Sequence, residues 1–168
     1  FVVENNAGAT GTNAMALAAQ AAPDGYTLEA TAITYSLLPY VFKSLPWNHE
    51  KDLVPVTTTV FVPYAIAVRA DAPYKTLGEL LAAAKASPGK LNYGSGGPGT
   101  APHFATESLM LAAKVDLTHI PYKGAGEAMT ALIGGQIDLF IASTASLMAH
   151  AKGGRARVLA VGGDKRLA

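Results

Sequence analysis

The sequence contains no cysteine, which excludes disulfides and thiolate chemistry within these residues. Charged residues are also scarce, at 15% of 168 residues, and 13 basic side chains stand against 12 acidic ones. A net charge of +1 gives no electrostatic basis for binding nucleic acid or an anionic membrane surface, so we expect no nucleic-acid partner. No apolar run approaches the ~20 residues of a membrane-spanning helix. The four histidines lack metal-binding spacing, so we expect neither a metal nor another cofactor.

Half of the residues are hydrophobic, which is enough for a buried core. Helix-like and strand-like segments alternate along the chain, and this pattern predicts an α/β fold with mainly parallel sheets. The predicted helices are 11–22, 36–43, 77–86, 102–113, 127–133 and 145–152. The predicted strands are 1–3, 26–34, 54–68, 91–93, 117–121, 138–142 and 157–161. Pro63 interrupts the third strand, which fits a segment that crosses between two lobes.

A glycine-rich stretch, LNYGSGGPGTAPH at 91–103, is the first candidate for a binding site. Bare N–H groups at Gly96, Gly97 and Gly99 can form a concave nest for an anion, and the helix that follows adds a partial positive charge. The loop has no Lys or Arg, so Ser95 and Thr100 are its side-chain donors. The alternative is a structural turn in which Thr100 caps the helix. A similar pattern, GATGT at 8–12, opens the first predicted helix.

Four further residues are candidates because they lie where predicted strands end or helices begin. His103 follows the glycine-rich stretch and could contact a ligand or tie the loop to its neighbours. Tyr122 and Lys123 end a strand and Ser143 caps a helix, so each could reach the mouth of a cleft. A solvated position for Lys123 is equally open.

Thr34 ends the strand predicted at 26–34, on the same side of the sheet as these candidates. It could therefore reach the cleft, with ordinary strand packing as the alternative. His119 alternates with apolar residues in a predicted strand, so we expect it to be structural.

An enzyme is the rival class of function. Gly94, Gly96 and Gly99 match the dinucleotide-binding pattern G-x-G-x-x-G, although no acidic residue closes a strand about 20 residues later. Ser95 lacks the G-x-S-x-G elbow of hydrolases, and the loop lacks the lysine of a P-loop. A nucleotide-binding α/β enzyme domain built on the loop at 94–99 therefore remains the alternative, while we expect no catalytic residues.

Several motifs resemble one family in the order in which they occur: VVENNAGATGT, APDGYTL, KSLPWNHEKDLVPVT, SPGKLNYGSGGPGTAPHFATE, HIPYKGAGEAMTALIGGQIDL and RVLAVGGDKR. The sequence is similar to the Bug-type solute-binding receptors of tripartite tricarboxylate transporters, which are periplasmic binding proteins of type II. The resemblance implies a periplasmic receptor that closes two lobes on a small organic acid, such as a di- or tricarboxylate. It further implies that the glycine-rich loop holds the ligand carboxylate and that membrane transporter subunits are partners.

The resemblance also predicts how the chain is divided. We expect 1–64 to be part of a first lobe, 65–162 to be a second lobe, and 163–168 to begin a crossover back to the first. The chain then represents a fragment of a receptor of about 300 residues. An incomplete first lobe exposes strand edges, which favours self-association.

Overall fold

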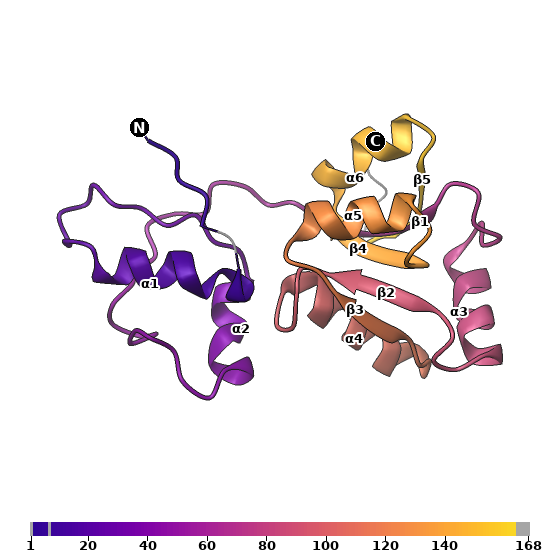
Figure 1. Ribbon diagram of the computed structural model, residues 1–168, viewed down its shortest axis with the longest axis horizontal. Coiled ribbons are helices and arrows are strands. Elements are labelled where there is room, and N and C mark those ends of the chain that lie inside the picture. Colours follow the sequence, from indigo (N-terminus) through magenta and orange to yellow (C-terminus); the bar gives the residue numbers. More distant parts are fainter. Residues whose placement is uncertain (1, 7, 164–168) are drawn as a thin grey trace.

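The computed structural model describes residues 2–6 and 8–163 and has two parts (Figure 1). The first lobe contains the 3-10 turn η1 (Ala9–Gly11) and the helices α1 (Thr12–Gln20) and α2 (Thr34–Val41). The second lobe begins with β1 (Tyr64–Arg69), which the chain enters directly from the first lobe. Within the described residues, no helix combines the length and the apolar character needed to cross a membrane.

The second lobe is built around a five-stranded sheet in the order β3-β2-β4-β1-β5. After β1 its elements are α3 (Leu77–Ala86), β2 (Asn92–Ser95), α4 (Ala101–Ala113), β3 (Thr118–Pro121), α5 (Ala125–Ile133), β4 (Leu139–Ser143), α6 (Thr144–Lys152) and β5 (Ala156–Val161). β2 pairs in parallel with β3 and β4, whereas β1 is antiparallel to both β4 and β5. Four strands therefore point the same way and only β1 is reversed. The predicted α/β class is confirmed, with one reversed strand that the alternating pattern did not reveal.

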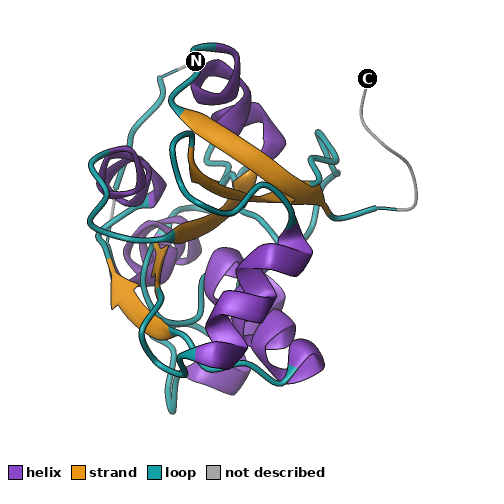
Figure 2. Cartoon of the chain, turned by 90° about the vertical axis from the view of Figure 1, so that its right-hand side faces the viewer, coloured by secondary structure: helices purple, strands orange, loops and turns teal. Residues whose placement is uncertain are grey.

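Helices cover both faces of this sheet, as Figure 2 shows. Ala65 and Ala67 of β1 pack under α5 and α6, whereas Ile66 and Val68 face the cluster that contains α3 residues. Side chains alternate in this way because successive residues of a strand point to opposite faces. Covering both faces explains why the central strands read as continuous apolar runs.

Local signals account for the start of α3. The Thr76 hydroxyl accepts a hydrogen bond from the Glu79 N–H at 3.2 Å, as in the capping box that the spacing of Thr76 and Glu79 in the sequence indicates. The Glu79 carboxylate accepts from the Lys75 N–H at 2.7 Å instead of the N–H of Thr76. The predicted helix at 77–86 is confirmed at both ends.

The first lobe differs from the prediction in its strands. Residues 26–33 and 54–63 contain no strand, and neither do Val2 and Val3, while Phe1 lies outside the described residues. Tyr26 and Phe61 are 93% and 91% exposed. A strand forms only when a neighbouring strand pairs with it, and the described part of the chain offers these segments none. The predicted strands at 26–34 and over the first part of 54–68 are therefore wrong for this structure.

Packing separates the two lobes. Met15, Leu38 and Trp47 form a small cluster of their own, and the two larger clusters draw only on residues after Pro63. The boundary near residue 64 stays a prediction, and the crossover expected at 163–168 falls almost entirely outside the described residues.

Candidate functional site

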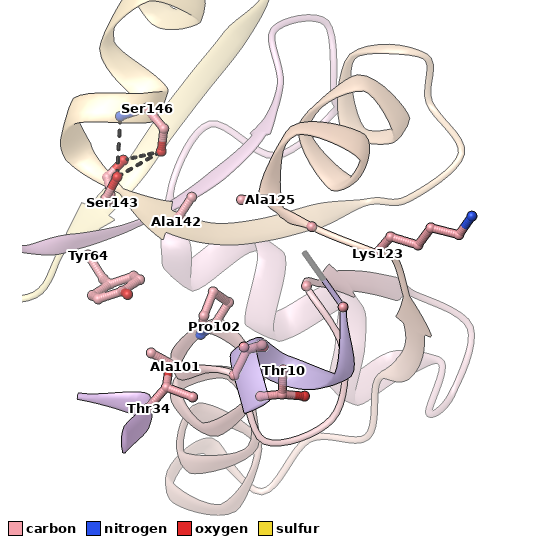
Figure 3. A pocket seen from close by; sticks show the side chains of 15 residues that line it. Thr10, Thr34, Tyr64, Ala101, Pro102, Lys123, Ala125, Ala142, Ser143 and Ser146 are labelled. Atoms are coloured by element: carbon pink, nitrogen blue, oxygen red, sulfur yellow. Dashed lines mark hydrogen bonds between the residues drawn. The ribbon is translucent and has the colours of Figure 1, made fainter. Parts of the chain in front are cut away.

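A cleft of about 360 Å³ lies between the two lobes (Figure 3). From the first lobe it is lined by the turn before α1 and by Thr34. The second lobe contributes Tyr64, part of the glycine-rich loop and the residues that begin α4, α5 and α6. Both lobes are thus needed to form the cleft.

Five helices begin at this cleft. The N-cap residues of four of them line it, namely Gly11 of α1, Thr100 of α4, Gly124 of α5 and Ser143 of α6, together with Thr34, the first residue of α2. The first N–H groups of a helix have no partner within it and carry a partial positive charge. The cleft therefore collects hydrogen-bond donors from five directions.

The capping pattern leaves part of these donors available, because the N–H groups of Thr12, Tyr35, Ser36 and Thr144 donate to backbone carbonyls outside their helices. Among the described residues, α1, α2, α4 and α5 have no side-chain cap, and only α6 is capped, by the Ser143 hydroxyl at 3.3 Å from the Ser146 N–H. By contrast α3, which does not reach the cleft, is capped by Thr76. Helix ends without a side-chain cap at a solvent-filled cleft are suited to binding an anion.

Charged side chains contribute little to the cleft. No acidic residue is among those that line it, and Lys123 is the one charged residue there, within the part of the chain that is described. Figure 3 shows the Lys123 side chain pointing away from the other lining residues. Attraction of an anion to the cleft must therefore come mainly from backbone dipoles.

Tyr64 supplies a phenol to the wall of the cleft (Figure 3). Burial raises the pKa of the Tyr64 hydroxyl, so it is a neutral donor at physiological pH. Because β1 runs antiparallel to its neighbours, the residue at its beginning, and not at its end, faces the cleft. The rule that ligands meet the carboxyl ends of parallel strands could not have identified it.

The bare backbone of the glycine-rich loop has a packing explanation. A Cβ on Gly99 would lie 2.9 Å from a methyl carbon of Val41, which belongs to α2 of the first lobe. A Cβ on Gly94 would lie 2.5 Å from Ile137 within the second lobe. Gly97 and Gly99 also have φ of +114° and +83°, which favour glycine. Part of the loop is therefore bare because the other lobe packs against it.

Most amides of this loop are used within the protein. The Gly97 N–H donates to the Ser95 hydroxyl at 3.0 Å, and the Gly99 N–H donates to Nδ1 of His103 at 3.3 Å. The Thr100 N–H donates to the Gly97 carbonyl at 3.3 Å. These three amides are not free for an anion, so the donors that face the cleft are those of the helix ends and not of a loop nest.

Beneath the loop, a stack of rings supports Ser95. His119 Nε2 lies 2.6 Å from the Ser95 hydroxyl, and the His119 ring stacks on Tyr93 with centroids 4.7 Å apart. Burial lowers the pKa of His119, and the neighbouring His103 lowers it further against the opposing effect of Glu107. Burial also raises the pKa of Tyr93, helped by its hydrogen bond to the Glu107 carboxylate at 2.6 Å. The expected structural role of His119 agrees with these contacts.

The structure brings together about half of the predicted site residues. Gly96, Thr100, Thr34, Lys123 and Ser143 line the cleft. Gly97 and Tyr122 line a second hollow, of about 480 Å³, on which Gly96 and Lys123 also border. Ser95, Gly99 and His103 line neither, because Ser95 is fully buried, Gly99 packs against Val41, and His103 supports the loop from below.

Sequence reasoning missed several residues of the cleft, in particular Tyr64, Thr10, Gly11 and Ala101. The repeated GATGT and GGPGT patterns were a usable signal, since both turns line the cleft.

The contacts disfavour the catalytic arrangements considered above. Ser95, the serine of a hydrolase reading, is hydrogen-bonded to His119 and is 0% exposed, so a substrate cannot reach it. Gly99 is the third glycine of the dinucleotide-binding pattern, which allows close packing of helix on strand, but here its nearest neighbour is Val41 of α2. No group of three or more potential metal ligands occurs among the described residues.

Comparison with known proteins gives a consistent assignment. The family model described as "Tripartite tricarboxylate transporter family receptor" matches residues 1–168. A Cupriavidus necator protein, described as "UPF0065 protein in gbd 5'region", is 40% identical over 99% of this chain. The chain spans 50% of that relative's length, and it covers a similar share of the solved structures it resembles.

Three solved structures are informative. A Rhodopseudomonas palustris protein solved with adipate is 28% identical over 99% of this chain and 56% of its own, with a TM-score of 0.93. MatC from the same organism, with bound malate, is 28% identical over 98% of this chain and 56% of its own, with a TM-score of 0.89. A Polaromonas solute-binding protein described as having no ligand is 33% identical over 99% of this chain and 56% of its own, but its TM-score is 0.69.

Proposed function

The chain belongs to the receptor family of the tripartite tricarboxylate transporters, and from that premise we propose that it forms much of the binding cleft of a periplasmic receptor for a small carboxylate. The ligand is a di- or tricarboxylate or a similar organic acid, held between the lobes and released to membrane subunits of the transporter. No chemical step takes place on it.

The convergence of five helix N-termini on a cleft without acidic side chains carries this proposal. Dipoles attract a carboxylate without the large desolvation penalty of a buried lysine or arginine, so binding stays reversible. Reversibility is what a receptor that must release its ligand requires.

Individual residues have distinct roles in the proposal. The Gly96 N–H and the first N–H groups of α4 and α5 bind the carboxylate, with the Tyr64 hydroxyl and Thr34 as further donors. Thr100 shapes the wall of the cleft, because its hydroxyl and its N–H both donate to the Gly97 carbonyl. The Ser143 hydroxyl accepts a hydrogen bond from the Ser146 N–H at the start of α6. Its role is therefore to position the first turn of α6 at the cleft, and its hydroxyl is not a separate contact to the ligand. Ser95 and His103 hold the glycine-rich loop in shape from below.

The arrangement of the two lobes also supports a receptor in its ligand-holding form. The neighbours recorded with adipate and with malate superpose on this chain more closely than the neighbour recorded with no ligand, although that neighbour is more similar in sequence. A difference of this kind is what relative movement of two lobes produces.

Titration calorimetry on the receptor that contains this chain tests the proposal. Adipate and malate are the first probes, and the neutral diamide of adipic acid is the matched control because it has the same carbon chain without the charge. We expect a dicarboxylate to bind and the diamide not to bind. Equal binding of the diamide would remove the argument from helix dipoles, and binding of NAD instead would favour the nucleotide-binding alternative.

A further inference from the structure

Two glycine-containing turns of similar sequence meet across the cleft. The turn at 8–11 opens α1 in the first lobe, and the turn at 96–99 opens α4 in the second. The Thr10 hydroxyl donates to the Pro98 carbonyl at 2.8 Å, which joins residues of different lobes. The position of a Cβ on Gly97 lies 3.8 Å from the same Thr10 oxygen, so the second turn leaves room for this side chain.

Thr10 holds an unfavourable backbone conformation to make this bond. Its φ and ψ are 60° and 26°, in the left-handed region that β-branched residues rarely adopt, and Ala9 before it has φ of 45°. Two hydrogen bonds within the first lobe stabilise this turn: the Thr12 hydroxyl donates to the Ala9 carbonyl at 2.8 Å, and the Gly11 N–H donates to the Gly8 carbonyl at 2.9 Å. Strain of this kind persists where the surroundings enforce it, often at functional sites.

The position of Thr10 gives the bond a consequence for the ligand. Thr10 lines both the cleft and the second hollow, as do Gly8, Gly96 and Lys123. The contact between Thr10 and Pro98 therefore lies where the two hollows meet at the boundary between the lobes. Loss of this hydrogen bond would remove a direct link between the two lobes beside the cleft that holds the ligand.

We propose that Thr10 is a latch residue, whose hydrogen bond to the Pro98 carbonyl holds the lobes closed and slows release of the ligand. This inference rests on the proposed receptor function, but it concerns lobe closure and not recognition of the carboxylate. Because the bond joins protein to protein, its loss weakens binding of every ligand that needs the closed form by a similar factor.

Three variants separate the hydroxyl from the backbone strain. Thr10→Val keeps the β-branch and removes the hydroxyl, Thr10→Ser keeps the hydroxyl, and Ala9→Gly relaxes the adjacent left-handed residue without touching the bond.

None of the 168 residues is cysteine, so the exposed Gln20 of α1 and Lys85 of α3 can each be replaced by cysteine and spin-labelled. Dipolar spectroscopy then measures the distance between the lobes with and without adipate, and stopped-flow measures adipate release.

We expect Thr10→Val to reduce the closed population without ligand and to speed adipate and malate release alike, by about two- to tenfold for one neutral hydrogen bond. Thr10→Ser and Ala9→Gly should keep the closed population at the wild-type level or above. A closed population that Thr10→Val leaves unchanged overturns the latch, and so does an effect on one ligand only, which would mean that the hydroxyl binds that ligand directly. If the receptor binds no carboxylate, the proposed function fails, while the distances measured without ligand still decide on the latch.

Discussion

Replacing Gly99 by alanine tests why the glycine-rich loop is bare. The substitution has two costs that can be separated. Gly99 has φ of +83°, and an alanine in the left-handed region costs roughly 1–2 kcal/mol whether or not the lobes touch. In addition, its Cβ would lie 2.9 Å from a Val41 methyl carbon, and such overpacking costs about 1–3 kcal/mol only when the lobes are together.

These magnitudes predict different readouts. The first cost lowers the thermal stability of the variant. The second lowers ligand affinity, by about 5- to 150-fold at ~1.4 kcal/mol per factor of ten. Calorimetry with adipate and thermal unfolding of the same samples measure the two costs independently.

Val41→Ala provides the matched rescue. With an alanine at 41, the nearest atom to the new Cβ at position 99 is the remaining Cβ at 3.4 Å, an ordinary contact. Val41 is only partly buried, so its own truncation should weaken binding by about 0.8 kcal/mol, half the value for two fully buried methyl groups, or about fourfold. We expect the double variant to bind more tightly than Gly99→Ala alone while remaining equally destabilised.

This reasoning is refuted if the double variant loses as much binding free energy as Gly99→Ala and Val41→Ala lose in sum. Glycine at position 99 would then be required by the ligand and not by Val41, as the anion nest predicted from the sequence implies. A double variant that regains stability but not affinity would have the same meaning.

Three further outcomes are expected. Burial lowers the pKa of His119, so at pH values below the ordinary histidine pKa of about 6.5 the unfolded chain binds more protons than the folded one. The free energy of unfolding, measured by denaturant titration, should therefore fall as the pH drops below about 6.5, and His119→Gln should make this fall smaller. Tyr64→Phe should weaken adipate binding about two- to tenfold, the worth of one neutral hydrogen bond, without changing the melting temperature; unchanged affinity would place the phenol outside the site. In hydrogen exchange, the sheet of the second lobe should be better protected than residues 2–63, and the opposite order would contradict the lobe boundary near residue 64.

The second lobe was predictable because its signals are local. The capping box at Thr76, the paired glycines at 134–135 and 153–154 that end α5 and α6, and the apolar runs of β4 and β5 each depend on neighbours close in sequence. Residues 26–34 and 54–63 carry equally strong strand composition, but composition does not supply a partner strand. The same reasoning therefore predicted the strands of the second lobe and the two helices of the first, and failed only for the strands of the first lobe.

The site was harder to predict than the fold because its key contacts are between distant segments. The sequence indicates that the backbone at Gly99 must be bare, yet an anion and a Val41 methyl group impose the same requirement, and only the packed structure distinguishes them. Tyr64 escaped notice for a related reason, since its place at the cleft follows from the reversed direction of β1. Helix N-termini converge on the cleft from both lobes, so the feature that carries the proposed function belongs to the arrangement of the lobes and not to any single motif.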